Sequence, residues 1–311
     1  GNDILFDDTL CEQGRNFCNK IWNAFRLIKS WNVDSTIELP QTSHEANLWF
    51  AARLRQSAAE ISDLFKKYRL SEALHEVYSL FWDDFSASYL EMIKPAYGSP
   101  IDSATYTTAL AFFDHLLHLL HPFMPFITEE IWQALPHEGD SIMVAKWPEY
   151  TEEYCFTEEA ADFTKVMDAI KAIRNRRAEM NVPPSKKAKL FIETDSAEVF
   201  EQGAPFLIKL ASASEVDINV EFDKAGAVQV ITDAAKIYIP MAELIDMAKE
   251  LERLNKEKEQ CEKQATGLEA RLNNPGFVNK APENVVAAER DRLAKLKERL
   301  AKLEESIAAM K

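Results

Sequence analysis

Apolar residues recur with a helical period along the first part of the chain, from Leu10 to about Leu135. Over residues 10–31 they fall at i, i+4, i+7, i+8 and i+11, which puts them on one stripe of a helix: Phe17, Ile21, Ala24, Phe25 and Ile28. The same period predicts further helices over residues 43–68, 71–93 and 103–120, and a short one near residue 128. Five helices with short connections predict a helical bundle over residues 1–150.

Some local details of this bundle are also predictable. Ser43 is expected to cap the second helix, and Leu48, Ala52 and Ala59 are expected to face the core. Residues 141–150 predict an extended exit from the bundle.

Residues 151–240 change character and predict a small α+β module. A helix is expected over residues 157–180, and it must end before Pro183 and Pro184 because proline blocks helix continuation. A second helix is expected over residues 196–211. Alternating apolar and polar residues predict the strands of an antiparallel sheet: 188–194, 215–222, 227–233 and 236–240.

Residues 241–311 carry two series of residues spaced alternately by three and four, which is the seam pattern of a coiled coil. The first series ends at Leu272 and the second begins at Val286. Pro275 and Pro282 lie between them, so the chain is predicted to fold back as an antiparallel coiled-coil hairpin. A coil that dimerises is the alternative. The three parts together predict a mainly α protein.

Charge changes this picture in one place. The formal net charge of −15 argues against general attraction to a polyanion. Residues 165–189, however, contain eight lysines and arginines against two acidic residues. A phosphate backbone would find a dense positive field there, and the candidates for such contacts are Arg174, Arg176, Arg177, Lys186 and Lys187.

The first predicted helix carries a second candidate surface. Arg15, Asn19, Asn23 and Arg26 fall at i, i+4, i+8 and i+11, with Lys20 and the aromatic Trp22 beside them. Arginine and amide side chains can hydrogen-bond the edges of unstacked RNA bases. The alternative is an ordinary solvent-facing surface, and the residues alone leave both interpretations open.

Catalytic and metal sites find little support in the sequence. Its eight glycines form neither a GxGxxG nor a GxxxxGK[ST] loop, and the four cysteines contain no CxxC pair. His115, His118 and His121 share a helical face, but no carboxylate or cysteine completes a ligand set at a recognisable spacing. We therefore predict no catalytic, cofactor or metal residue. Scattered cysteines and the lack of a long apolar run predict a reduced, cytoplasmic protein without a membrane span.

Five segments together resemble the valyl-tRNA synthetase family, in that family's order: GRNFCNKIWNAFRLI (14–28), FWDDFSASYLEMIKP (81–95), LLHPFMPFITEEIWQ (119–133), IRNRRAEMNVPPSKK (173–187) and LNNPGFVNKAPENVV (272–286). The bundle motif alone is shared more loosely with the isoleucyl and leucyl enzymes, whereas the fourth and fifth segments, with the terminal hairpin, make the resemblance to the valyl enzyme specific. An isoleucyl enzyme is the less favoured relative because the chain lacks a cysteine-rich, zinc-binding tail.

The resemblance implies that the bundle binds the anticodon and that the hairpin reaches the outer corner of tRNA. Arg15, Asn19, Lys20 and Asn23 fall on the family's motif in the first bundle helix. A separate pair at the tip of the hairpin, Phe277 and Lys280, would supply stacking and charge.

The chain departs from the family in one respect, because it contains neither a HIGH-type nor a KMSKS-type motif. We therefore expect a C-terminal piece that is inactive alone. The implied full-length enzyme joins valine to its tRNA with ATP and magnesium, as a monomer with catalytic and editing domains in cis. The alternative from another functional class is a scaffold whose coil recruits a protein partner.

Overall fold

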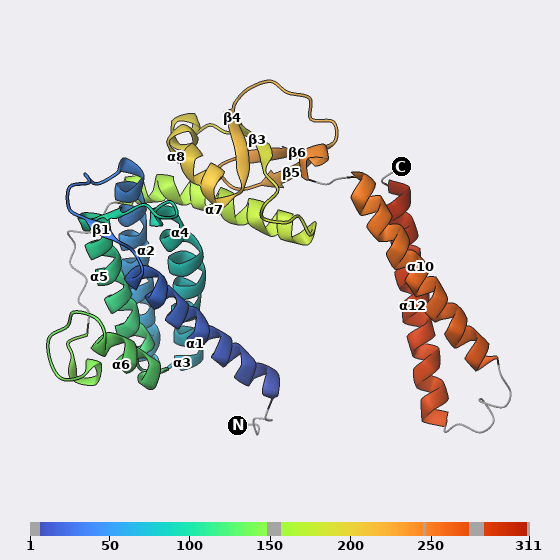
Figure 1. Cartoon of the computed structure of the whole chain (residues 1–311), viewed down its shortest axis with the longest axis horizontal. Helices are drawn as coiled ribbons and strands as arrows, with labels where there is room; N and C mark the ends of the chain where they lie inside the picture. The colour runs from blue at the N-terminus through green and yellow to red at the C-terminus, as the bar shows by residue number, and fades with distance from the viewer. Residues whose placement is uncertain (1–6, 148–156, 245–246, 274–282, 310–311) are drawn as a thin grey trace.

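The computed structural model describes residues 7–147, 157–244, 247–273 and 283–309. It is mainly α-helical, as predicted, with a small sheet after the bundle (Figure 1). The bundle consists of α1 (Asp8–Lys29), β1 (Val33–Asp34), α2 (Gln41–Lys66), α3 (Leu70–Ser79), η1 (Leu80–Tyr89), α4 (Leu90–Ile93), β2 (Ile101–Asp102), α5 (Ser103–Leu120), α6 (Pro125–Gln133) and η2 (Ile142–Val144). The remaining elements are α7 (Thr157–Glu179), β3 (Ala188–Glu193), α8 (Ala197–Leu210), β4 (Ala213–Ile218), β5 (Ala227–Ile231), β6 (Lys236–Pro240), α9 (Met241–Leu244), α10 (Met247–Leu272) and α12 (Glu283–Ala309).

Helix α1 packs on the bundle with the apolar stripe predicted for it. Phe17, Ile21, Ala24 and Ile28 are buried. The helix begins after Asp7, whose carboxylate accepts a hydrogen bond from the Thr9 amide at 2.8 Å and so satisfies one of the free amides of the first turn.

Helix α2 corrects two details of the prediction. It begins directly after Pro40, so Ser43 lies inside the first turn and is buried instead of capping the helix. Its buried side is also rotated from the predicted one, because Ala59 is exposed whereas the neighbouring Ala58 is buried. The large side chains Trp49 and Phe50 determine which side of the helix enters the core.

The helix predicted over 71–93 is continuous but not uniform, since its middle part, η1, is a ten-residue π-helix. The amide of Leu90 donates to the carbonyl of Phe85, five residues back, and the Ser88 hydroxyl donates to the Asp83 carbonyl at 2.8 Å. The wider turn lets Asp84 and Phe85 both point inward, and both are buried. Heptad-like spacing in the sequence does not distinguish this turn from an α-helical one.

The sheet after the bundle is mixed, which corrects the antiparallel prediction. Its strand order is β4-β3-β6-β5. Strand β3 pairs antiparallel with β6 but parallel with β4, because helix α8 crosses over between β3 and β4 and returns the chain in the same direction. Residues 142–144 form the 3₁₀ helix η2 instead of the extended exit predicted there, with the Ser141 hydroxyl accepting a hydrogen bond from the Met143 amide.

Helices α10 and α12 lie side by side in opposite directions (Figure 1). Their buried side chains fall on the predicted seam: Cys261, Ala265, Leu268 and Val286. Ion pairs join the two helices, including Arg271 to Glu289 at 3.2 Å and Lys297 to Glu269 at 2.6 Å. Residues 274–282 lie outside the described residues, so the turn of the hairpin and its coiled-coil character stay predictions. The domain limits at 150 and 240 also stay predictions.

Candidate nucleic-acid interface

The predicted polar stripe lies on the solvent side of α1. Arg15, Asn19, Asn23 and Arg26 are all exposed. Arg15 pairs with Glu12, one helical turn before it, at 3.8 Å, and both side chains are about two-thirds exposed. A pair of this kind is screened by water and contributes little, so the guanidinium is available to a ligand.

Beside this stripe lies a set of stacked aromatic side chains that the sequence analysis did not single out. The rings of Tyr78 and Trp82 lie 5.4 Å apart and nearly parallel, at 13°. The ammonium of Lys20 lies over the Trp82 ring, 5.1 Å from its centroid, and the Phe17 ring supports Tyr78 from below at 4.6 Å. We call Lys20, Tyr78 and Trp82 the stacking platform. Flat rings next to amides and a cation match the requirements of an unpaired base.

A signal for Tyr78 and Trp82 was present in the sequence. Their spacing of four residues places both on one side of a helix. In the structure Tyr78 is 37% exposed, because the π-helix that follows it rotates the inward side toward Phe81, Asp84 and Phe85.

The basic stretch 165–189 was predicted to face a phosphate backbone, but two of its candidate residues form hydrogen bonds inside the protein. Arg177 is 5% exposed and donates to the carbonyl of Lys186. Arg174 donates to the carbonyls of Leu210 at 2.7 Å and Ala87 at 3.0 Å. Burial lowers the pKa of both guanidinium groups. In this conformation their charges hold the fold together instead of facing a phosphate backbone.

Three other candidates in the stretch remain accessible. Arg176 is exposed and pairs with Glu179 at 3.1 Å, Lys187 is exposed, and Lys186 is half-buried. All three lie at the end of α7 or in the turn that follows it. Contacts between RNA and any of these residues stay a prediction. Phe277 and Lys280 lie outside the described residues.

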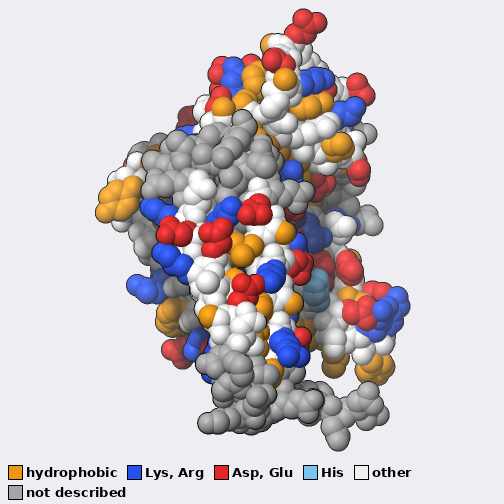
Figure 2. Space-filling model, turned by 90° about the vertical axis from the view of Figure 1, so that its right-hand side faces the viewer, with side chains coloured by type: hydrophobic (Ala, Val, Ile, Leu, Met, Phe, Trp, Pro, Cys, Tyr) orange, Lys and Arg blue, Asp and Glu red, His pale blue; other side chains and the backbone are white. Residues whose placement is uncertain are grey.

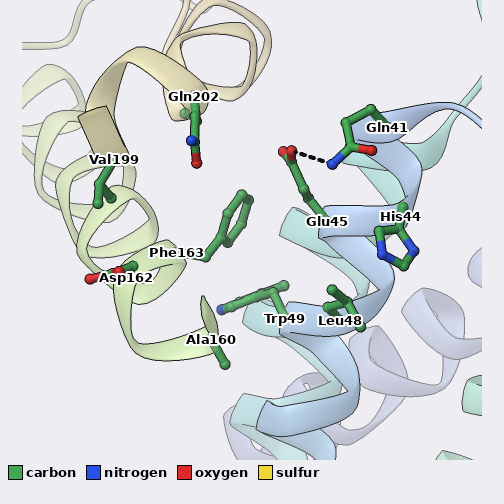
Figure 3. Close-up of a pocket in the computed structure, with 11 residues that line it drawn as sticks. Gln41, His44, Glu45, Leu48, Trp49, Ala160, Asp162, Phe163, Val199 and Gln202 are labelled. Atoms are coloured by element: carbon green, nitrogen blue, oxygen red, sulfur yellow. Dashed lines mark hydrogen bonds between the residues drawn. The ribbon is translucent and has the colours of Figure 1, made fainter. Parts of the chain in front are cut away.

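A cavity of about 240 Å³ lies between α2, α7 and α8 (Figure 3). The side chains of Glu45, Phe163 and Gln202 converge on it from the three helices, and Glu45 accepts a hydrogen bond from Gln41 at 3.1 Å. Asp162 also lines the cavity and pairs with Lys165 at 2.7 Å. Carboxylates at the rim make this cavity a poor site for a phosphate group.

The three histidines of α5 and its C-terminal end have protein contacts. A ring nitrogen of His118 lies 2.9 Å from the Asp114 carbonyl, and one of His121 lies 2.8 Å from the Thr128 hydroxyl. Burial lowers the pKa of His115 and of His121. Within the described ranges, no three histidine, cysteine or acidic side chains cluster as metal ligands would, and no helix has the length and apolar character needed to cross a bilayer.

The helical arm differs from α1 in its electrostatics. In the view of Figure 2, which looks at the molecule from the side of α10 and α12, lysine and arginine side chains alternate with acidic ones. Cross-helix pairs such as Lys258 to Glu304, at 2.8 Å, account for part of this pattern. Over its described residues the arm offers mixed charge, so any RNA contact there must depend on particular residues instead of a general positive field.

Comparison with known proteins identifies the parts. Residues 47–192 match the family described as the anticodon-binding domain of tRNA ligase, and residues 246–311 match the valyl tRNA synthetase tRNA binding arm. The chain is also 45% identical to the valine–tRNA ligase of Parabacteroides distasonis over 294 residues. The chain belongs to the valyl-tRNA synthetase family. Members from Porphyromonas gingivalis and Clostridium acetobutylicum are 46% and 40% identical to it.

These alignments cover nearly the whole chain but only part of each relative. They include 94% of this chain and 33% of the Parabacteroides and Porphyromonas ligases. The chain thus spans about a third of the length of the valyl-tRNA synthetases it matches.

Proposed function

We propose that this chain is the tRNA-binding part of a valine–tRNA ligase, in which the bundle binds the anticodon and the helical arm binds the outer corner of the tRNA. The observation that carries the proposal is the exposed stripe of Arg15, Asn19 and Asn23 beside the stacking platform. Such a surface combines hydrogen-bonding groups for base edges with flat rings for base faces. The matches to an anticodon-binding domain and a tRNA-binding arm support the same assignment.

The remaining features of the proposal follow from the longer relatives. The full-length protein would attach valine to its tRNA in the cytoplasm as a monomer, with ATP and magnesium used by catalytic and editing domains in cis. The sequence holds no HIGH-type or KMSKS-type motif, so we assign neither ATP nor magnesium to residues of this chain. The chain alone is expected to bind tRNA without charging it.

The test is a binding titration of the 311-residue chain with valine tRNA transcripts that carry either the native or an altered anticodon. We expect binding that weakens as salt rises and weakens further when the anticodon is altered, because base contacts add to phosphate contacts. Equal affinity for both transcripts at every salt concentration would refute anticodon recognition by this surface. An alanine variant at Asn23, which is exposed, should lower affinity for the native transcript more than for the altered one.

A further inference from the structure

Three cations of α7 and α8 bind groups on the segment formed by η1, α4 and the residue after it. The Lys171 ammonium lies 2.8 Å from a carboxylate oxygen of Asp84. Arg174 donates to the Ala87 carbonyl at 3.0 Å. Lys209 donates to the carbonyls of Met92 at 2.8 Å and Lys94 at 3.0 Å. The acceptors are therefore distributed from the middle of η1 to the residue that follows α4.

These acceptors have chemical reasons to be bound. The carbonyls of Met92 and Lys94 lie at the C-terminal end of a helix, where backbone carbonyls lack partners and the helix dipole favours a cation. Arg174 also donates to the Leu210 carbonyl at 2.7 Å, so a single guanidinium joins the end of α8 to η1. Each of these bonds includes a charged donor, which makes it stronger than a neutral hydrogen bond.

The Asp84 contact extends into the bundle. Its carboxylate is 2% exposed and also accepts a bond from the Nε of Arg53 at 2.7 Å. Arg53 in turn pairs with Glu76 at 3.0 Å, and Glu76 accepts a bond from the Ser57 hydroxyl at 2.6 Å. Side chains from α2, α3, η1 and α7 are thereby joined in one charge-balanced network.

The opposite side of η1 carries part of the stacking platform. Trp82 lies two residues before Asp84, and its ring faces Lys20 and Tyr78. A shift of η1 would move Trp82 relative to Lys20 on α1. The contacts that α7 and α8 make with η1 and α4 therefore determine the geometry of the stacking platform, although α7 and α8 contribute no residue to it.

We propose that Lys171, Arg174 and Lys209 are positioning residues for RNA binding. They hold η1 and α4 against α7 and α8, keep the stacking platform in place and make no contact with RNA. This inference rests on the proposed function. It also gives Arg174, which the sequence analysis proposed as a phosphate contact, a different role: support of the stacking platform.

The dependence of affinity on salt distinguishes support from contact. A lysine that binds a phosphate contributes roughly 0.7 to 0.9 to the slope of log K against log salt, whereas a lysine that makes no phosphate contact contributes nothing to it. Lys171→Met and Lys187→Met each remove one positive charge, and Lys187 is exposed in the turn after α7. The two variants of the full chain are titrated with the native valine tRNA transcript over a range of salt concentrations.

We expect Lys171→Met to weaken binding by roughly 3- to 30-fold at every salt concentration with an unchanged slope. Lys171→Arg, which can still pair with Asp84, should restore most of the affinity. A smaller slope for Lys171→Met, or an unchanged affinity, would overturn the inference.

A measurement without RNA keeps the inference separate from the proposed function. The chain is labelled with fluorinated tryptophan, and the ¹⁹F resonance of Trp82 is assigned from its loss in Trp82→Phe. This resonance should shift in Lys171→Met and stay in place in Lys187→Met. An unmoved Trp82 resonance in Lys171→Met overturns the positioning role even if the chain binds no tRNA, and failure of tRNA binding with a shifted resonance counts against the proposed function alone.

Discussion

Replacing Asp84 by asparagine should destabilise the bundle by about 3 kcal/mol. The side chain is 2% exposed and accepts bonds from Arg53 at 2.7 Å and Lys171 at 2.8 Å. Each bond to a buried charge contributes about 1.5–3 kcal/mol, and the Lys171 share is reduced because that side chain is 44% exposed. Asparagine keeps the volume, so no cavity adds to the loss, but its amide can accept from only one of the two cations.

Urea unfolding followed by tryptophan fluorescence is the appropriate assay, because all six tryptophans lie in the bundle, between residues 22 and 147, and one of them, Trp49, also contacts Phe163 of α7. Asp63→Asn is the matched control. Asp63 pairs with Lys67 four residues later, and both side chains are more than half exposed, so its loss should cost below about 0.5 kcal/mol. Equal small losses in both variants would refute the view that the Asp84 network is shielded from solvent and holds α7 to the bundle.

Three further predictions concern other parts of the chain. Gly203→Ala should cost about 1–3 kcal/mol of thermal stability, because the added carbon would lie 2.6 Å from Val166, whereas Gly267→Ala in α10 meets nothing within 4 Å and should stabilise its helix by up to about 1 kcal/mol. His115 has its pKa lowered below 6.5 by burial, so the unfolded chain takes up the proton first and stability should fall as pH drops below 6.5; urea midpoints at neutral and acidic pH should differ less for His115→Gln, and an equal difference would contradict the assignment. Asn19→Ala should weaken binding of the native valine tRNA transcript about 5- to 30-fold without changing the salt slope, as measured by titration, and a reduced slope would argue against a base contact.

The apolar period along the chain predicted the helices well, because burial of one apolar side supplies most of the free energy that places a helix against its neighbours. The α1 stripe was right in every core residue except Phe25, which is half-buried. The register of α2 was wrong because small alanines give little preference between neighbouring sides, whereas Trp49 and Phe50 decide the packing. The parallel pairing of β3 with β4 could not be predicted from alternation, which is the same in both kinds of sheet.

The candidate site was predictable only in part. The exposure of the amides and arginine of α1 on one side of the helix could be predicted because their spacing is a local property of that helix, and their contact with RNA stays a prediction. The internal hydrogen bonds of Arg174 and Arg177 could not be predicted, because folding of the chain brings their carbonyl partners close to them. Those partners are Leu210, Ala87 and Lys186. Charge density in a sequence does not separate a cation that faces solvent from one that binds a carbonyl.

The π-helix η1 also determines the directions in which the later side chains of the same helix point around its axis. A residue added to an α-helix turns the chain by about 100°, so a π-helical turn displaces later side chains around the axis relative to earlier ones. In η1 this displacement lets the half-buried Trp82 stack on Tyr78 while Asp84 and Tyr89 face the interior. The function of the segment from Leu80 to Tyr89 therefore depends on its length as much as on its composition. Deletion of a single residue would keep most of its side chains, but Trp82 and Asp84 could no longer reach the platform and the buried network at the same time.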